Sequence, residues 1–181
     1  MRRVKENTIF NQKILNSYGL SNQSLIQTIE HTYHVIDAID RNLLDANISR
    51  FSKLVELANL SAMIGNLFRS GIIKFSNNLF QENKPHTFPD LISTNNNYPD
   101  LEIKVALETN KPKGHLVKPG SHIVIRYCLG NEDGSFLKGK TNRGEVAWIW
   151  QVCIGELMEE HFNISNTDGD SGKTAVINQK G

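Results

Sequence analysis

The sequence predicts a mixed α/β fold in which an N-terminal helical part packs against a β-sheet formed by the rest of the chain. Residues 1–71 contain two segments whose apolar side chains recur every three or four positions, which is the helical repeat. Residues 88–181 instead contain short runs rich in β-branched and aromatic residues, which is typical of strands. With 181 residues and 39% hydrophobic content, we expect one domain over 1–181 with a sizeable core.

The first helix is expected at residues 24–47. Ser21 and Ser24 stand at its start, and serine is a residue type that caps helix N-termini. Its apolar positions have spacings of mostly three and four, and they are Leu25, Ile29, Ile36, Ile39 and Leu43. This pattern predicts an amphipathic helix with one buried face.

The second helix is expected from about residue 51 to residue 69, with Gly71 placed to end it. Apolar residues cover most of its circumference, so we expect it to be buried. Its polar exceptions fall within one sector of about 80° at 100° per residue, and they are Ser52, Glu56, Asn59 and Asn66. Either this stripe faces solvent or it faces a polar site, because unpartnered burial of such groups is costly.

Strands are expected at 88–92, 101–107, 122–129, 146–154 and 174–177, with loops at 81–87 and 93–100. The runs at 122–129 and 146–154 have the composition of central strands. In 101–107 the side chains alternate with a period of two. This places Glu102 and Lys104 on one face and Leu101, Ile103 and Val105 on the other.

The charge distribution is uneven although the formal net charge is only +1. Between Lys104 and Arg143 there are eight Lys or Arg residues and three acids. The ordinary interpretation of such a stretch is a solvated face. Any affinity for nucleic acid would have to come from this local patch, because the chain as a whole is nearly neutral.

Two features indicate the compartment. Cys128 and Cys153 lie in apolar stretches and not at metal-ligand spacing, so we expect reduced core thiols. The N-terminus is charged but has no apolar run behind it, which predicts neither a signal peptide nor a membrane span. A cytoplasmic protein is expected.

Two acids and a lysine have the pattern needed for phosphodiester hydrolysis. That reaction needs an activated water and a positive charge to stabilise the phosphate, and Mg²⁺ held by one or two carboxylates supplies both. Adjacent strands of a hairpin hold two carboxylates about 4–5 Å apart. Asp90 follows Pro89 in one apolar segment, and Glu102 and Lys104 lie in the next, on the same strand face.

Pro89-Asp90 with Glu102-Ile103-Lys104 resembles the core signature of the PD-(D/E)xK nuclease superfamily. The resemblance covers roughly residues 50–155 and is most like a Type II restriction endonuclease. It implies a restriction-endonuclease-like fold, a mixed central sheet flanked by helices. It also implies that Asp90 and Glu102 bind Mg²⁺, that Lys104 orients the attacking water, and that Glu56 on the preceding helix is an auxiliary carboxylate.

Two alternatives remain open at these positions. Pro99-Asp100 is a second Pro-Asp pair, and Asp100 would share the strand face of Glu102, although it ends an Asn-rich turn. We prefer Asp90 because it lies in an apolar, strand-like segment. Alternatively, Glu102 and Lys104 are a surface ion pair and Asp90 is a turn residue.

A P-loop nucleotide site is rejected on physical grounds. Residues 134–141 match the P-loop pattern, Gly-x-x-x-x-Gly-Lys-Thr. A P-loop joins a buried parallel strand to a helix whose N-terminus faces the phosphates. Here an acidic turn precedes the pattern and a Trp-rich strand follows it, so an NTPase is not expected.

DNA contacts are expected from polar residues that follow the catalytic strand or lie near residue 140. Lysines would contact phosphates, Arg143 guanine or phosphate, and Asn142 adenine. These residues are Lys111, Lys113, His115, Lys138, Lys140, Asn142 and Arg143. Solvent exposure without DNA contact is the alternative for each.

The function implied by the resemblance is Mg²⁺-dependent, sequence-specific cleavage of double-stranded DNA by a Type II restriction enzyme. A homodimer is expected, because two-fold symmetry matches a palindromic site. The cellular partner would be a cognate DNA methyltransferase, without a stable complex. The alternatives are a repair or junction-resolving nuclease of the same fold, or a non-catalytic DNA-binding module.

Overall fold

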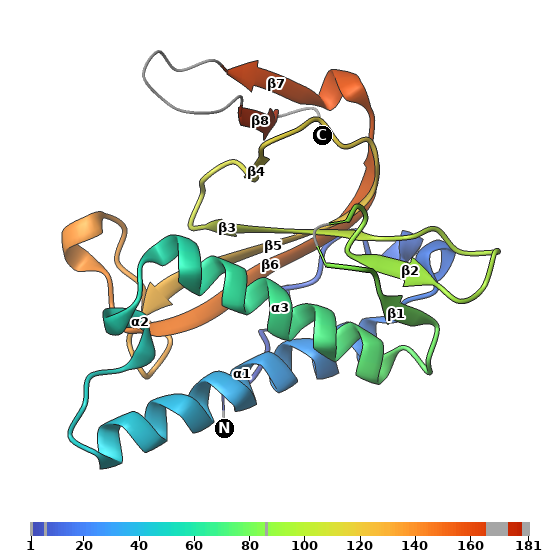
Figure 1. The fold of residues 1–181 in the computed structure, drawn as a ribbon. Helices are drawn as coiled ribbons and strands as arrows, with labels where there is room; N and C mark the ends of the chain where they lie inside the picture. The colour runs from blue at the N-terminus through green and yellow to red at the C-terminus, as the bar shows by residue number, and fades with distance from the viewer. Residues whose placement is uncertain (1, 6, 86, 166–173, 179–181) are drawn as a thin grey trace.

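A computed structural model describes residues 2–5, 7–85, 87–165 and 174–178, and it has the mixed α/β architecture that the sequence predicts (Figure 1). Its helices are α1 (Asn22–Asp45), α2 (Phe51–Leu54) and α3 (Leu57–Phe75). Its strands are β1 (Phe80–Glu82), β2 (Leu91–Ser93), β3 (Glu102–Leu107), β4 (Lys113–Gly114), β5 (Gly120–Gly130), β6 (Val146–Leu157), β7 (Phe162–Ser165) and β8 (Thr174–Ile177). Short 3₁₀ turns lie at Gln12–Tyr18, Lys140–Asn142 and Glu159–His161.

The main sheet contains three strands in the order β3-β5-β6. Strand β3 runs parallel to β5, and β5 runs antiparallel to β6, so the sheet is mixed. Helices α1 and α3 pack on each other and lie below the sheet in Figure 1. The small β4-β8-β7 sheet lies on the opposite side, and the β1-β2 ribbon lies beside the start of β3 (Figure 1).

The core lies between the helices and one face of the main sheet. On β5, Ile123, Ile125 and Tyr127 are fully buried, whereas Val124 and Arg126 between them are half-buried. The helices contribute Leu25, Ile29, Tyr33 and Ile36 from α1 and Leu60, Ile64, Phe68 and Ile72 from α3. The apolar side chains of the sheet therefore face the helices, and the polar ones face the other way.

The first helix is confirmed with a shift of two residues. Ser21 is its N-cap, and the Ser21 hydroxyl accepts a hydrogen bond of 3.0 Å from the backbone N–H of Ser24. The Ser24 hydroxyl in turn accepts from the backbone N–H of Ser21, which completes a capping box. Both serines named from the sequence thus act at this helix start.

The second helix differs from the prediction. The chain forms the short α2, leaves the helical conformation at Val55 and Glu56, and starts again as α3. Gly71 does not end α3, because the helix continues to Phe75. Gly71 is instead a packing position, where an added Cβ would lie 2.9 Å from Cγ2 of Thr28 on α1. Its missing side chain lets the two helices approach closely.

The expected all-round burial of this segment is also wrong. Only one stripe of α3 is buried, and Leu54 is 51% exposed. Of the polar stripe, Glu56, Asn59 and Asn66 are exposed and Ser52 is half-buried. Glu56 immediately precedes α3, so it is not a buried acid on a helix. Propensity and periodicity do not reveal the break, because both flanking segments are good helix formers.

The long strands and the short β8 are confirmed, whereas the other short strands differ from the prediction. β5 and β6 contain the predicted runs, β3 begins one residue later than predicted, and β8 has the predicted bounds. The segment 88–92 was expected to be a strand from its first residue, but β2 begins at Leu91. β1, β4 and β7 have four residues or fewer, and they lie in segments that have loop composition. Tertiary pairing, not local preference, makes them strands.

Residues 134–141 lie in the turn that joins β5 to β6, which are antiparallel neighbours. The described residues 142–145 that lead into β6 contain no α-helix, and only the 3₁₀ turn Lys140–Asn142 precedes β6. This geometry excludes a P-loop at residues 134–141.

Within the described part of the chain, no helix has the length and apolar character needed to cross a bilayer. Cys128 and Cys153 are free thiols.

The outer edge of β6 is covered by other parts of the chain. Backbone bonds of 2.8 Å join Phe10 N to Val152 O and Val152 N to Thr8 O. Further along, the Tyr33 hydroxyl from α1 accepts a bond of 3.0 Å from Ile149 N and donates one of 3.1 Å to Ile149 O. The ladder with β5 skips one residue of β6 at this level, which is a β-bulge. A side chain therefore satisfies main-chain groups next to the bulge.

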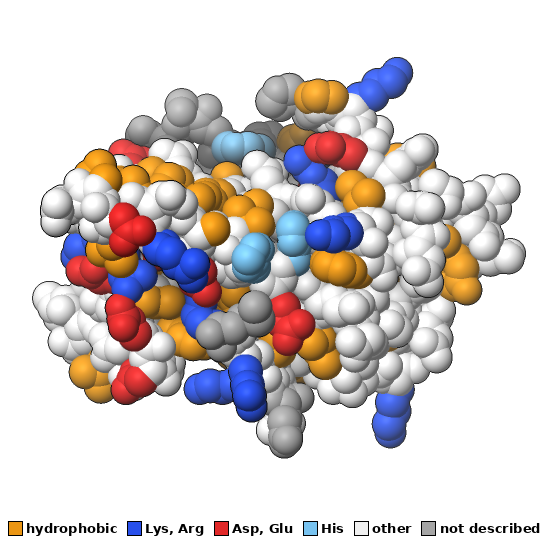
Figure 2. Space-filling view, turned by 90° about the horizontal axis from the view of Figure 1, so that it is seen from below, with side chains coloured by type: hydrophobic (Ala, Val, Ile, Leu, Met, Phe, Trp, Pro, Cys, Tyr) orange, Lys and Arg blue, Asp and Glu red, His pale blue; other side chains and the backbone are white. Residues whose placement is uncertain are grey.

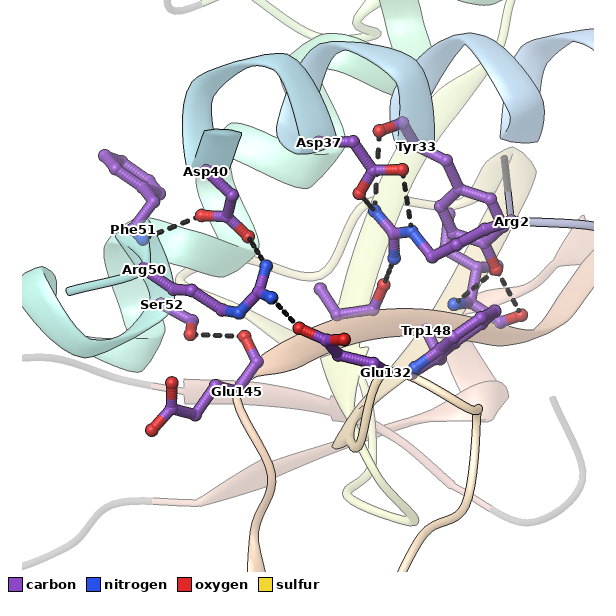
Figure 3. A network of polar contacts seen from close by, with 12 residues as sticks. Arg2, Tyr33, Asp37, Asp40, Arg50, Phe51, Ser52, Glu132, Glu145 and Trp148 are labelled. Atoms are coloured by element: carbon purple, nitrogen blue, oxygen red, sulfur yellow. Dashed lines mark hydrogen bonds and ion pairs between the residues drawn. The ribbon is translucent and has the colours of Figure 1, made fainter. Parts of the chain in front are cut away.

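An ion-pair network fixes the helices against the β5–β6 hairpin (Figure 3). Asp40 of α1 accepts a bond of 2.8 Å from the backbone N–H of Phe51, which starts α2. Arg50 pairs with Asp40 and with Glu132 in the hairpin turn. Arg2 pairs with Asp37 of α1 at 2.6 Å (Figure 3). The N-terminal segment, α1, α2 and the hairpin turn are thus held together at one end of the sheet.

We expect Tyr33→Phe to reduce the free energy of unfolding by about 1–3 kcal/mol, since it leaves the buried N–H and C=O of Ile149 without a partner. Denaturant unfolding followed by circular dichroism measures this change. Tyr98→Phe is the matched control, because the Tyr98 hydroxyl makes no hydrogen bond among the residues that the structure describes. Equal stability of the two variants would contradict the role given to Tyr33.

Candidate active site

Strand β3 forms one edge of the main sheet and presents two different faces. Ile103 and Val105 pack against the core. Glu102 and Lys104 project from the opposite face, and the register pairs Glu102 with His122 of β5. The alternation predicted from the sequence is therefore confirmed, and the predicted acid and lysine share one face.

The carboxylate of Asp90 is bonded to the open edge of β3. Leu91 and Leu101 exchange two backbone hydrogen bonds of 2.9 Å, so the segments that carry Asp90 and Glu102 run antiparallel side by side. Asp90 Oδ2 accepts a bond of 2.8 Å from the backbone N–H of Ile103. Because Ile103 directly follows Glu102 in the chain, this bond holds the Asp90 carboxylate at the backbone next to Glu102, whose charge acts on it.

Asp100 has a different position. Its Oδ1 accepts a hydrogen bond of 2.7 Å from the backbone N–H of Ser93, which closes the turn between β2 and β3. Asp100 is exposed, whereas Asp90 is half-buried. The structure therefore brings Asp90, and not Asp100, to the backbone of Ile103 beside Glu102.

Glu102 is the buried charge of the site, with 3% of its side chain exposed. Its Oε1 accepts hydrogen bonds of 2.6 Å from Lys104 Nζ and 3.1 Å from Lys118 Nζ. Burial alone would raise the pKa of Glu102, but the bonds and charges of Lys104 and Lys118 outweigh it and hold the pKa below its ordinary value. Glu102 is therefore ionised at neutral pH. Its Oε2 is buried and has no hydrogen-bond partner in the described ranges of the chain.

Asp90 shows the opposite shift. Burial raises the pKa of its carboxyl group, and the negative charge of Glu102 raises it further. The Ile103 N–H and the charges of Lys104 and Arg69 act against this rise without cancelling it. Arg69 Nη1 lies 4.0 Å from Asp90 Oδ1, but Arg69 pairs more closely with Glu82, at 2.8 Å. Two neighbouring carboxylates thus repel each other with incomplete compensation.

Asp90 and Lys104 line a cleft of roughly 280 Å³ that opens at the edge of β3. Helix α3 forms one wall with Ser61, Asn66 and Arg69, and Lys113 of β4 completes the lining. Of the polar stripe singled out on the second predicted helix, only Asn66 reaches this cleft. Glu56 does not line the cleft.

These residues fit a Mg²⁺ ion better than a transition metal. Among the described residues, no group of three or more His, Cys, Asp or Glu side chains is placed to hold a metal. Mg²⁺ is commonly held by one or two carboxylates, with waters and substrate phosphates as its other ligands. The orphaned Oε2 of Glu102 and the incompletely neutralised Asp90 are hard oxygen donors of this kind.

The predicted DNA-contacting residues fall into two separate groups. Lys111, Lys113 and His115 lie in and beside β4, and all three are exposed. Lys138, Lys140, Asn142 and Arg143 lie in the β5–β6 turn, at the opposite end of β3 from Glu102 (Figure 1). Arg143 donates a bond of 2.7 Å to Glu108, and Asn142 donates to the carbonyl of Lys138. Lys113 alone of the seven lines the cleft with Asp90.

The helix side of the molecule lacks the appearance of a DNA-binding face. Seen from below, basic and acidic side chains are interspersed at one end, and the rest of this face carries only scattered charges (Figure 2). A duplex requires a continuous basic surface. The polar face of the main sheet, on the other side, is the better candidate.

Sequence reasoning missed three residues of this site. Lys118 bonds to Glu102 from the loop before β5, Arg69 reaches Asp90 from α3, and His122 lies beside Glu102 with its Nε2 buried and unpartnered. The sequence could have indicated His122, because residues 122, 124 and 126 lie on one face of a strand whose other face is apolar. The sequence offers Lys118 only as a candidate DNA contact, and nothing in it predicts the bond of Lys118 to Glu102 or the approach of Arg69 to Asp90.

Searches with this chain against models of protein families, against curated proteins and against solved structures find no match. The assignment of a function therefore depends on the geometry of the residues alone.

We expect Asp90→Asn to raise the thermal unfolding midpoint at neutral pH in the absence of divalent ions. The substitution removes a half-buried carboxylate repelled by Glu102 and keeps an oxygen for the Ile103 N–H. Because the folded-state pKa of Asp90 is raised, the gain is present above that pKa and disappears as the pH falls and the wild-type carboxyl becomes protonated.

Differential scanning calorimetry over a pH series, with Asp100→Asn as the control, measures this difference. The control keeps the oxygen that bonds to Ser93, so its midpoint should follow that of the wild type. An Asp90→Asn variant that is less stable than the wild type at neutral pH would show that Asp90 is a structural ion-pair residue.

Proposed function

We propose that this chain is a Mg²⁺-dependent endonuclease of the PD-(D/E)xK kind that hydrolyses double-stranded DNA, as Type II restriction enzymes do. The observation that carries the proposal is the hydrogen bond from Ile103 N to Asp90 Oδ2, which joins the Pro-Asp segment to the Glu-Ile-Lys strand. Two sequence segments thereby meet in the order and orientation that the resemblance requires. A simple surface ion pair would leave neither Glu102 buried nor Asp90 beside it.

The two carboxylates would hold the ion. A bound Mg²⁺ supplies a water of lowered pKa and positive charge for the phosphate. Asp90 is held by a backbone N–H and Glu102 by two lysines, so neither carboxylate has to reorganise greatly to bind a cation. Such preorganisation is what a catalytic site on a rigid strand provides.

Lys104 would act on the water and the phosphate. Lys104 lines the cleft with Asp90, and its ammonium group is bonded to Glu102 Oε1 at 2.6 Å. The three donors of an ammonium group allow it to keep this bond while donating to a water or to a phosphate oxygen. Lys118 would keep its bond to Glu102 while Lys104 donates to the water or to a phosphate oxygen of the substrate.

The surroundings of the cleft favour an anionic substrate. Arg69 and Lys113 line the cleft, and Lys118 lies next to it through Glu102. These cations attract a phosphodiester and balance the charge that builds up on it during hydrolysis.

The proposal further includes a homodimer, because one such site cuts one strand and a two-fold axis places a second site on the other. A cognate methyltransferase would protect the cell's own DNA.

We expect Asp90→Asn and Lys104→Met each to reduce cleavage of duplex DNA about 100-fold or more, because each removes a group that acts on the reacting atoms. The measurement is the rate of appearance of discrete fragments from phage DNA with purified protein and Mg²⁺, together with DNA binding by gel shift. Binding should persist in both variants, since neither substitution alters the rest of the surface.

Asp100→Asn is the matched control for this experiment. It changes the second Pro-Asp pair, which closes a turn away from the cleft, and should leave the cleavage rate as it is in the wild type. Retained cleavage by Asp90→Asn or Lys104→Met would overturn the proposal. DNA binding with no cleavage in any divalent metal would instead indicate a non-catalytic DNA-binding module.

A further inference from the structure

Five arginines are half-buried in the described part of the chain, and four of them pair with carboxylates. The paired ones are Arg2, Arg50, Arg69 and Arg143. Arg126, in the middle of β5, is the exception among the described residues, because no carboxylate lies within ion-pair distance of it. An unpaired guanidinium partly withdrawn from water costs free energy, so its retention calls for a ligand.

The contacts of Arg126 leave one side of its guanidinium available. Its Nη1 donates a hydrogen bond of 3.0 Å to Gln151 Oε1 on β6, which fixes the plane of the group. The Trp150 ring lies 6.0 Å from the guanidinium carbon. The Nε–H is buried and donates to no acceptor among the residues that the structure describes. A neutral amide holds the group in position without neutralising its charge, which is the arrangement of an anion-binding arginine.

Arg126 lies in a second, larger cleft of roughly 590 Å³ on the polar face of the main sheet. The β4-β8-β7 side of the molecule forms the opposite wall, and Lys111 adds a second positive charge to the lining. Among the described residues that line the cleft, Glu156 is the one acid, and its Oε2 accepts a bond of 2.6 Å from Ser121. Glu156 and Gln151 are five residues apart on β6, so this acid lies at the other end from Arg126. The Arg126 end is cationic.

The sheet register relates this cleft to the candidate active site. Lys104 pairs with Val124 and Ala106 pairs with Arg126, so Lys104 and Arg126 project from the same face of adjacent strands. The Cα atoms of two residues that lie on adjacent strands and differ by two positions in register are about 8 Å apart. Successive nucleotides of a duplex strand rise by about 3.4 Å, so this separation corresponds to about two nucleotides of a bound strand.

We propose that Arg126, with Lys111 in the same cleft, binds a backbone phosphate of the DNA strand that is cut, about two nucleotides from the scissile bond. The inference rests on the proposed function, because it takes DNA as the ligand. A phosphate contact positions the strand without reading its bases. Arg126 is therefore a positioning residue, and its effect should be the same for every DNA sequence.

The test is the affinity of a short fluorescent duplex measured by anisotropy over a salt series, with EDTA present so that no cleavage occurs. Arg126→Gln should weaken binding about tenfold and reduce the slope of log K against log salt by about one, equally for unrelated sequences. Arg41→Gln is the matched control, because Arg41 is exposed on α1 on the helix side. Its affinity and slope should equal those of the wild type.

A second measurement separates a DNA site from a structural arginine or a site for free phosphate. The thermal midpoint of Arg126→Gln should equal or exceed that of the wild type, whereas loss of a structural contact would lower it. The NMR signal of the Arg126 Nε–H should shift when duplex is added. A shift with inorganic phosphate and none with duplex would overturn the inference.

The two proposals fail in different ways. If the wild type cuts DNA and Arg126→Gln binds it with unchanged affinity and slope, the phosphate site is wrong and the nuclease assignment stands. If Arg126→Gln weakens binding but no divalent metal produces cleavage, the phosphate site stands and the nuclease assignment is wrong.

Discussion

The separation of the main sheet into an apolar face and a polar face governs the rest of the structure. Strands β3, β5 and β6 direct their apolar side chains toward α1 and α3, where Ile123, Ile125 and Tyr127 are fully buried. Because successive strand residues point to opposite faces, this burial forces Glu102, Lys104 and Arg126 to the other side. A shift of one residue in β3 would bury both charges against the helices.

The candidate active site concentrates charge that the folded chain does not fully balance. Glu102 has two lysine partners for one oxygen and none for the other, and Asp90 is repelled by Glu102 with incomplete compensation from its surroundings. Such an arrangement would lower the stability of the isolated protein, and under the proposed function a bound cation and an anionic substrate would balance these charges. Arg126 is likewise incompletely balanced, as a positive charge that has no carboxylate partner among the described residues.

The sequence was sufficient to predict the elements that depend on local pattern. The helix that begins after Ser21 and the strands β5 and β6 are long and periodic, and the alternation in β3 placed Glu102 and Lys104 correctly on one face. The sequence alone could not decide between Asp90 and Asp100 as the first acid of the site. Only the bonds of Asp90 to Ile103 and of Asp100 to Ser93, seen in the structure, distinguish the two acids. Long-range contacts such as those of Lys118 and Arg69 leave no trace in local composition. Glu56 was misplaced because a two-residue break divides a segment with uniform helical preference.

The covered edge of β6 has a consequence for the order of assembly. The strip at residues 8–10 completes that edge, yet Asn11 and its partner Ile154 are 143 residues apart in the chain. During synthesis the early segment must wait until Val152 and Ile154 have emerged before it can bind to β6. Such distant pairings slow the search for the native state and leave an unpaired strand edge exposed in the meantime. The chain is therefore most prone to aggregate in the interval before its beginning docks onto β6.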